Sequence, residues 1–181
     1  PYLKVIFINF TKINNKSAQF IASSKRLFFD TVGAFFLRRW NQTEKENIVS
    51  VKDSMLPELL RIQKEAFENG SKEKLIRYSK NARDIFYVIK DQEKIAGFCI
   101  YYLRPSLSLN GFKKKSIISS IAIDKDFRGR GLAERILIES IKEMKLNGIV
   151  SIGLYVNVNN QPAIRLYEKM GFEVTQQIKN I

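Results

Sequence analysis

The stretch "DKDFRGRGLAERIL", Asp124–Leu137, alternates two arginines with two glycines and then continues with the spacing of an amphipathic helix. The N-terminus of a helix has unpaired backbone N–H groups and a partial positive charge, and glycine lets a ligand approach the backbone closely. The pattern therefore predicts a turn that binds phosphate, while an ordinary turn with two solvated arginines is the alternative. Neither the P-loop motif nor the dinucleotide fingerprint is present, because Glu134 stands where the latter needs glycine. The residues expected to surround the phosphate are Arg128, Gly129, Arg130 and Gly131.

The composition is that of a folded chain of 181 residues, 45% of them hydrophobic, which fits one domain with an appendage. No apolar run approaches the roughly 18 residues that a membrane span needs, so no membrane partner is expected. The single cysteine, Cys99, excludes an intrachain disulfide and, without an export signal, favours a reducing cytoplasm. Because the chain has no histidine, Ser-His and Cys-His mechanisms are excluded and no metal site is expected.

The formal net charge is +13. The basic excess is spread along the chain, since residues 1–46 carry eight Lys/Arg against three Asp/Glu and the remainder carries 23 against 15. Such a chain should attract nucleic acid, the ribosome or a phosphate-rich cofactor, unless the charge is only a solvated lysine-rich surface.

From residue 47 to residue 181 the hydrophobic pattern predicts the order β-α-α-β-β-β-α-β-α-β, a mixed sheet with helices on it. Two strands, 84–90 and 94–103, are expected to form a hairpin, and residues 103–115 are expected to form a loop. Residues 1–46 are interpreted as a separate basic, Phe-rich extension that consists of a strand near 2–10 and a helix near 24–40.

Two motifs resemble those of the GNAT acetyltransferases. Arg128, Gly131 and Ala133 match the pattern R-x-x-G-x-[GA], which follows a strand in that family. The stretch "NNQPAIRLYEKMGFE", Asn159–Glu173, matches N-x-x-A-I-x-L-Y-x-K-x-G-F and lies about one helix and one strand further along. The resemblance extends over about residues 48–177 and is strongest for the branch that acetylates protein N-termini, including the ribosomal-protein alanine acetyltransferases.

The resemblance implies a mostly antiparallel central sheet flanked by helices, and acetyl-CoA as co-substrate with no metal. It also implies that backbone N–H groups of the glycine loop hold the pyrophosphate of acetyl-CoA. An N–H group of the preceding strand, residues 120–123, is expected to stabilise the oxyanion. The cofactor-binding residues expected on this basis are Ile121, Ala122, Ile123, Arg128, Gly129, Arg130, Gly131, Leu132, Ala133, Asn160 and Tyr167.

The reaction implied is direct transfer of acetyl to a primary amine, in the first place a protein N-terminal α-amino group. Tyr167 is expected to protonate the departing thiolate, although the spacing of its helix by itself favours a core tyrosine. Tyr155 stands where the bacterial ribosomal-type enzymes carry a glutamate, so the expected route for deprotonating the amine is water helped by Tyr155. Asp124 and Glu68 are weaker candidates for this base. Phe67 and Glu68 are expected to line the acceptor site.

One departure from the family concerns the last strand. Family members usually add a strand after the one expected here at 172–180, and it completes a hairpin beside the substrate groove. The sequence carries no such strand up to Ile181. We expect Tyr2–Phe10 to cover or extend the sheet instead, in the same chain or by exchange in a dimer, because exposed sheet edges are usually covered.

Several alternatives remain at this point. Lysine side chains and small amines compete with a protein N-terminus as the acceptor. A regulator that binds CoA without turnover is a second class. A ribosome- or RNA-binding module is a third, and it is favoured by the net charge and by "FKKKS", residues 112–116. The sequence fits a monomer or a homodimer.

Overall fold

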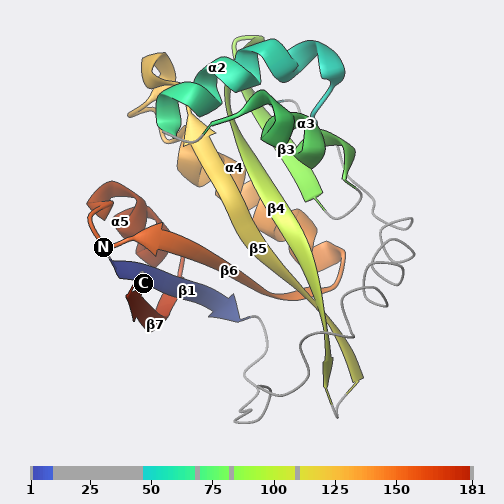
Figure 1. Cartoon of the computed structure of the whole chain (residues 1–181), viewed down its shortest axis with the longest axis vertical. Helices are drawn as coiled ribbons and strands as arrows, with labels where there is room; N and C mark the ends of the chain where they lie inside the picture. Colours follow the sequence, from blue (N-terminus) through green and yellow to red (C-terminus); the bar gives the residue numbers. More distant parts are fainter. Residues whose placement is uncertain (1, 10–46, 68–69, 82–83, 109–110, 180–181) are drawn as a thin grey trace. The chain divides into compact units, whose positions relative to one another are not determined.

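The computed structural model describes residues 2–9, 47–67, 70–81, 84–108 and 111–179. The chain forms two compact units, and their elements are drawn in Figure 1. Each unit combines strands of a sheet with helices, which confirms the mixed α/β class. The helix expected near residues 24–40 lies outside the described residues. The first unit consists of Pro1–Asn41, Leu103–Ile117 and Lys145–Ile181, and the second of Gln42–Tyr102 and Ile118–Met144.

In the first unit, strand β1 (Tyr2–Asn9) lies between β6 (Ile149–Asn157) and β7 (Glu173–Lys179) and pairs antiparallel with both (Figure 1). Val5 of β1 lies opposite Tyr155 of β6. The prediction that the N-terminal strand extends the sheet is confirmed, and the pairing is within the same chain. β1 fills an interior position of the order β5-β6-β1-β7, with a pairing strand on each side, rather than covering an edge.

Helix α5 (Gln161–Lys169) joins β6 to β7, and both of its ends are capped as its sequence predicts. The side-chain oxygen of Asn160 accepts a hydrogen bond from the backbone N–H of Ala163 at 3.3 Å, and a proline lies in the first turn. After the helix, Gly171 has φ +84°, a conformation that favours glycine, and the N–H of Phe172 donates to the carbonyl of Tyr167 at 3.0 Å. These caps fix where α5 begins and ends.

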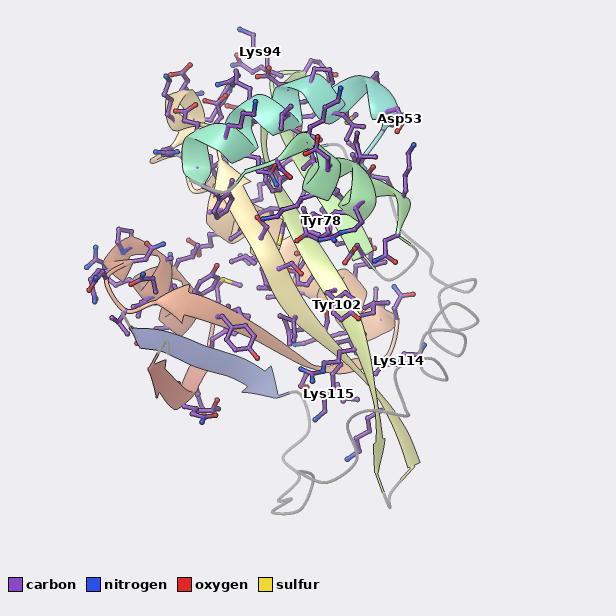
Figure 2. The ribbon with its side chains drawn as sticks, in the orientation of Figure 1. Asp53, Tyr78, Lys94, Tyr102, Lys114 and Lys115 are labelled. Atoms are coloured by element: carbon purple, nitrogen blue, oxygen red, sulfur yellow. The ribbon has the colours of Figure 1, made fainter. Side chains whose placement is uncertain are left out.

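Strands β4 (Lys94–Ser108) and β5 (Gly111–Ile123) are longer than the sequence analysis expected. The prediction that residues 103–115 form a loop is wrong, because nearly all of them belong to these two strands. Alternating serine and leucine at 106–109 have the two-residue period of a strand, and Gly111 follows an asparagine, a pair typical of tight hairpin turns. Figure 2 shows Lys114 and Lys115 on the resulting hairpin.

The second unit holds the order β2-β3-β4-β5, in which β2 (Ile48–Ser50) pairs antiparallel with β3 (Asp84–Asp91) and β3 with β4. The expected hairpin between β3 and β4 is confirmed, and its turn places Gln92 and Glu93 at positive φ. The helices of this unit are α2 (Leu56–Ala66), α3 (Lys72–Lys80) and α4 (Leu132–Leu146), with single turns η1 (Asp53–Met55) before α2 and η2 (Lys125–Phe127) before α4.

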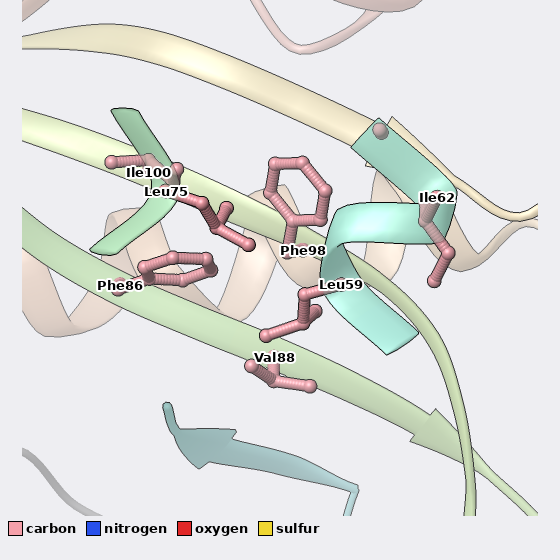
Figure 3. Packing of buried hydrophobic residues seen from close by; sticks show 8 residues of the cluster. Leu59, Ile62, Leu75, Phe86, Val88, Phe98 and Ile100 are labelled. Carbon is pink, nitrogen blue, oxygen red and sulfur yellow. The ribbon is translucent and has the colours of Figure 1, made fainter. Parts of the chain in front are cut away.

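Alternating residues of β3 and β4 serve two different faces of the second unit. Phe86, Val88, Phe98 and Ile100 pack with Leu59, Ile62 and Leu75 of α2 and α3, as Figure 3 shows. Two of the residues that alternate with them, Tyr87 and Tyr101, form hydrogen bonds with side chains of α4. The sheet is therefore covered on both faces, and this explains why its strands are buried without a polar alternation.

Candidate active site

The glycine loop between β5 and α4 has the conformation that its sequence predicts. Gly129 has φ +78° and Gly131 has φ +72°, a region that other residues rarely adopt. A Cβ atom built on either glycine would meet nothing within 4 Å. These glycines therefore serve the backbone conformation rather than close packing within the protein, and the space in front of them is open.

Helix α4 begins directly after this open turn. Its first intrahelical hydrogen bond runs from the N–H of Arg135 to the carbonyl of Gly131 at 3.0 Å. By helix geometry the preceding N–H groups have no partner inside the helix, and they carry the positive end of the helix dipole. Residues Gly131, Leu132 and Ala133 thus offer donors to an anion, and the expected pyrophosphate of acetyl-CoA fits such a site.

Asp124, at the junction between β5 and the loop, fixes the position of the turn through hydrogen bonds and an ion pair. It is only 2% exposed. Its Oδ1 accepts a hydrogen bond from the N–H of Asp126 at 3.0 Å, and its own N–H donates to the carbonyl of Ala96 on β4 at 2.9 Å. Its other oxygen, Oδ2, forms a hydrogen-bonded ion pair with the guanidinium of Arg61 on α2.

These partners stabilise the ionised form of Asp124. Burial acts to raise the pKa of Asp124, but the N–H of Asp126 and the guanidinium of Arg61 lower it more, so the pKa lies below its ordinary value. The pKa of Arg61 is raised, first by its hydrogen bond to Glu58 and then by the one to Asp124. Asp124 is therefore a structural carboxylate, which makes it a poor general base and weakens the proposal that it deprotonates the amine.

Arg61 connects the loop to α2. Its Nη2 atom lies 2.7 Å from Oε1 of Glu58, and its Nη1 atom lies 3.2 Å from Oε2 of Glu65. Lys125 of the loop lies 3.7 Å from the same Glu65 carboxylate. The start of the glycine loop is thus tied to one face of α2 by a small network of charges.

The two arginines of the motif also brace the loop. Nε of Arg128 donates to the carbonyl of Ile123 at 3.0 Å. Arg130 donates to Asp91 at 2.9 Å and to the carbonyl of Asp126 at 3.1 Å, and its guanidinium lies 5.1 Å from the ring centroid of Phe127. Both side chains remain exposed, so they add positive charge beside the open turn while they hold its shape.

The strand that precedes the loop is packed closely against β4. A Cβ atom on Gly97 would lie 2.4 Å from the carbonyl oxygen of Ala122 and 2.6 Å from Cδ1 of Ile123. Only glycine allows this approach of the two backbones. Ala122 is buried, whereas Ile121 and Ile123 are half-buried. The segment expected to supply the oxyanion donor is therefore held against its neighbour at the point where the loop begins.

Buried polar contacts hold α4 on the sheet. The hydroxyl of Tyr87 donates to Oε1 of Glu143 at 2.5 Å, and the hydroxyls of Tyr101 and Ser140 lie 2.7 Å apart. Ser140 also donates to the carbonyl of Ile136 at 2.5 Å. These contacts fix the axis of the helix whose first turn faces the open loop.

The one thiol of the chain takes no part in this chemistry. Cys99 is fully buried, and burial raises the pKa of its thiol to about 12. Such a thiol is not a nucleophile at neutral pH. In the described part of the chain, no three Asp, Glu or Cys side chains are grouped closely enough to hold a metal ion. No helix among the described residues is long and apolar enough to cross a membrane.

The remaining candidate residues belong to the first unit. Tyr167 of α5 is 5% exposed, and its ring meets that of Phe172 edge-on with centroids 5.7 Å apart. The prediction that Tyr167 points inward is confirmed. Tyr155 on β6 is half exposed, and Asn160 is occupied as the N-cap of α5. A catalytic role for either tyrosine, and a cofactor contact for Asn160, stay predictions.

Of the two residues expected at the acceptor site, Phe67 follows α2 directly and is 38% exposed. Glu68 lies outside the described residues. Sequence reasoning missed the roles of Arg61 and Gly97. A glycine inside a strand pattern is a recognised sign of close backbone approach, so Gly97 could have been found. Arg61 gave no local signal, because its partner lies 63 positions further along the chain.

Comparison with known proteins gives a consistent result. The model of the family described as "Acetyltransferase (GNAT) family" matches residues 53–172. The chain is 30% identical over 106 residues to an uncharacterised N-acetyltransferase of Methanocaldococcus jannaschii. This aligned stretch covers 55% of this chain and 44% of that protein. It is 26% identical over 125 residues to the ribosomal protein bS18-alanine N-acetyltransferase of Escherichia coli, 69% of this chain and 79% of that enzyme. The chain spans less than half the length of the Methanocaldococcus jannaschii relative.

Solved structures agree on the fold. The crystal structure of the Escherichia coli enzyme of that name superposes with a TM-score of 0.59 at 26% identity, covering 71% of this chain and 78% of that one. NAA60 of Arabidopsis thaliana, solved with a bisubstrate analogue, superposes with a TM-score of 0.63 at 20% identity, covering 71% of this chain and 85% of that one.

Proposed function

The chain belongs to the GNAT family of acetyltransferases, and on that premise we propose that it transfers the acetyl group of acetyl-CoA to a primary amine. The observation that carries this proposal is the open glycine turn at the start of α4. A Cβ atom on Gly129 or Gly131 would meet no atom within 4 Å, so the turn is open. Hydrogen bonds of Asp124, Arg128 and Arg130 hold the turn in place. An anion-binding turn that is already ordered loses little conformational entropy when acetyl-CoA binds.

The pyrophosphate of acetyl-CoA would be bound by backbone N–H groups of residues 129–133, with Arg128 and Arg130 adding positive charge at the rim. The acetyl group would lie along residues 121–123, where a backbone N–H stabilises the oxyanion of the tetrahedral intermediate. Acetyl-CoA supplies an activated thioester. Both substrates are held together, so proximity contributes much of the rate.

In the proposed reaction the neutral amine forms a bond to the acetyl carbon and the carbon–sulfur bond breaks. The amine loses a proton to water, helped by the hydroxyl of Tyr155, and the departing thiolate takes a proton from Tyr167. The exposure of Tyr155 is compatible with a water-mediated route. The buried position of Tyr167 is compatible both with this role and with a packing role, so its part in the reaction needs a kinetic test.

We propose a protein N-terminal α-amino group as the acceptor, with lysine side chains and small amines as the competing acceptors. The proposal is supported by the match to the ribosomal protein bS18-alanine N-acetyltransferase of Escherichia coli. Phe67, exposed at the end of α2, is proposed to contact the acceptor. We further propose that the protein associates with the ribosome and that it is a monomer or a homodimer. A cytoplasmic location stays a prediction, which rests on the presence of a single cysteine in the sequence.

We also propose that β1 is an integral strand of the acetyltransferase sheet. Its position between β6 and β7, antiparallel to both, supports this proposal. The N-terminal segment up to residue 46 would then complete the acetyltransferase domain of residues 47–181 rather than act as an independent module.

The test of this function is release of free CoA thiol from acetyl-CoA with a panel of acceptors. The panel contains peptides with a free α-amino group, the same peptides with a blocked α-amino group and a free lysine, and small polyamines. The proposal predicts turnover with the free N-terminus and mass addition of one acetyl group there. Turnover with the blocked peptides alone would overturn the acceptor, and binding of acetyl-CoA without turnover on any amine would overturn the enzyme.

A further inference from the structure

Positive charge is divided unevenly between the two units. The described residues of the first unit carry nine Lys/Arg against two Asp/Glu, whereas those of the second carry 14 against 12. These units divide the chain differently from the comparison of residues 1–46 with the remainder, in which both parts carry a basic excess. A surface with an excess of positive charge attracts a polyanion more strongly than a surface whose charges balance.

Four of these nine cations lie on one structural feature, the described outer part of the β4–β5 hairpin, residues 103–108 and 111–117, which we call the hairpin end. They are Arg104, Lys113, Lys114 and Lys115. The hairpin end contains no Asp or Glu, and none occurs between Glu93 and Asp124 in the whole sequence.

Three of the four cations have no acidic partner among the residues that the structure describes. Arg104 and Lys115 are exposed and Lys113 is half-buried, and none of the three forms an ion pair with another described residue. Lys114 differs, because its Nζ donates to the carbonyl of Asn147 at 3.2 Å. In the second unit several cations are paired, including Arg61, Lys90, Arg130 and Lys142.

The strand geometry arranges these cations for repeated contacts. Lys113 and Lys115 are two residues apart on β5, so they share one face of the strand about 7 Å apart. Figure 2 shows Lys115 and Lys114 on this part of the hairpin. A row of flexible ammonium groups suits the phosphates of a nucleic-acid backbone, which bind lysine as a point charge without sequence readout.

We propose that the hairpin end binds the phosphate backbone of single-stranded RNA. This site belongs to the first unit, whereas the acetyl-CoA turn belongs to the second, and it serves to hold the protein on a polyanion. The choice of RNA over DNA rests on the proposed function. The N-terminus of a new protein is accessible to an acetyltransferase while that protein is made on the ribosome, and the ribosome is rich in RNA. The phosphate contacts themselves do not depend on acetyl transfer.

The test is fluorescence anisotropy with a labelled single-stranded RNA of about 20 nucleotides, titrated at several salt concentrations. Neutralising three phosphates on a single strand predicts a slope of about −2 for the logarithm of the binding constant against the logarithm of salt. The triple variant Arg104→Gln, Lys113→Gln, Lys115→Gln should bring that slope close to zero and weaken binding at least tenfold at low salt. Lys114 is kept because it bonds to the protein.

A matched control removes the same charge elsewhere. Lys72, Lys74 and Lys80 are exposed on α3 of the second unit, and the triple change of these lysines to glutamine should alter RNA affinity no more than about twofold. If both triple variants weaken binding equally, only net charge matters and the proposal is overturned. Binding of the wild type to vesicles rich in phosphatidylserine, with no binding to RNA, would also overturn it.

Two further measurements separate this proposal from others. The melting temperature of the hairpin variant, and its shift with acetyl-CoA, should equal those of the wild type. If the triple variant melts early, Lys115→Gln alone should still reduce the slope by about 0.7. A protein that binds RNA as predicted but acetylates no amine would refute the proposed function alone. A protein that acetylates amines, but whose RNA affinity is unchanged by the substitutions in the hairpin end, would refute this inference alone.

Discussion

Arg61 on α2 and Asp124 at the end of β5 form an ion pair that joins helix α2 to the start of the glycine turn. The carboxylate is buried, while the guanidinium is partly exposed and also contacts Glu58 and Glu65. Loss of one partner from such a pair leaves a buried charge or a buried polar group without its main contact. The pair therefore lets the conformation of the turn be tested apart from the ligand.

Asp124→Asn should lower the free energy of unfolding by about 1.5–3 kcal/mol at pH 7, the usual contribution of hydrogen bonds to charged groups. The pKa of Asp124 is lower in the folded chain than its ordinary value of about 3.9. A depressed folded pKa means that the extra stability is complete above about pH 4 and is lost as the pH falls through the folded pKa. The difference in melting temperature between the two proteins should be constant from pH 7 to pH 5 and shrink below pH 4.

Asp91→Asn is the matched control for this experiment. Asp91 pairs with Arg130, but the side chains in that pair are 29% and 54% exposed. An exposed pair typically contributes less than about 1 kcal/mol, so this variant should melt close to the wild type. A melting difference for Asp124→Asn that stays unchanged down to pH 2 would show that the lost group is not a charge.

Gly97→Ala should destabilise the second unit, because the added methyl would overlap the carbonyl oxygen of Ala122. The obstacle is backbone, so the strands must move apart, at a typical cost of about 1–3 kcal/mol. For a chain of this size that corresponds to roughly 2–12 °C in melting temperature. Ser119→Ala, at an exposed position of β5, should leave the melting temperature within about a degree. An unchanged melting curve for Gly97→Ala would contradict the close approach of β4 and β5.

The spacing of apolar residues and the local caps predicted α2, α4 and α5 well. Asn160 and Gly171 are within a few residues of the helix that they cap, so the signal lies in a short stretch of sequence. The glycine turn was predictable for the same reason. Residues 103–115 were predicted as a loop, and they contain Pro105, Asn110 and Gly111, residue types that are common in turns and loops.

The long-range relationships could not be read from local patterns. Arg61 and Asp124 are 63 positions apart, and an exposed-looking arginine on a helix gives no sign of its partner. The place of β1 between β6 and β7 was foreseen only as an extension of the sheet, because hydrophobic alternation does not say which edges a strand will pair with.

Tyr167→Phe should separate chemistry from packing. The ring stays and keeps its edge-on contact with Phe172, so only the hydroxyl is lost. As a general acid, Tyr167 is expected to contribute about 100-fold to kcat, the low end of the usual range, because a thiolate leaves readily. As a core tyrosine only, its loss would lower stability by about 1–3 kcal/mol and leave kcat of the folded fraction unchanged. The measurement is kcat beside a melting curve, with Tyr155→Phe as the second variant.

The central claim is that the glycine turn before α4 holds acetyl-CoA, and calorimetric titration of acetyl-CoA tests it most directly. Gly131→Asp places a carboxylate where the pyrophosphate should lie. Gly148→Asp is its matched control, because Gly148 has the same positive φ, at +80°, and the same open space, at the other end of the same helix. We expect Gly148→Asp to bind within about twofold of the wild type and Gly131→Asp to lose at least 100-fold, or about 2.7 kcal/mol. Equal affinity of the two variants for acetyl-CoA would contradict the claim.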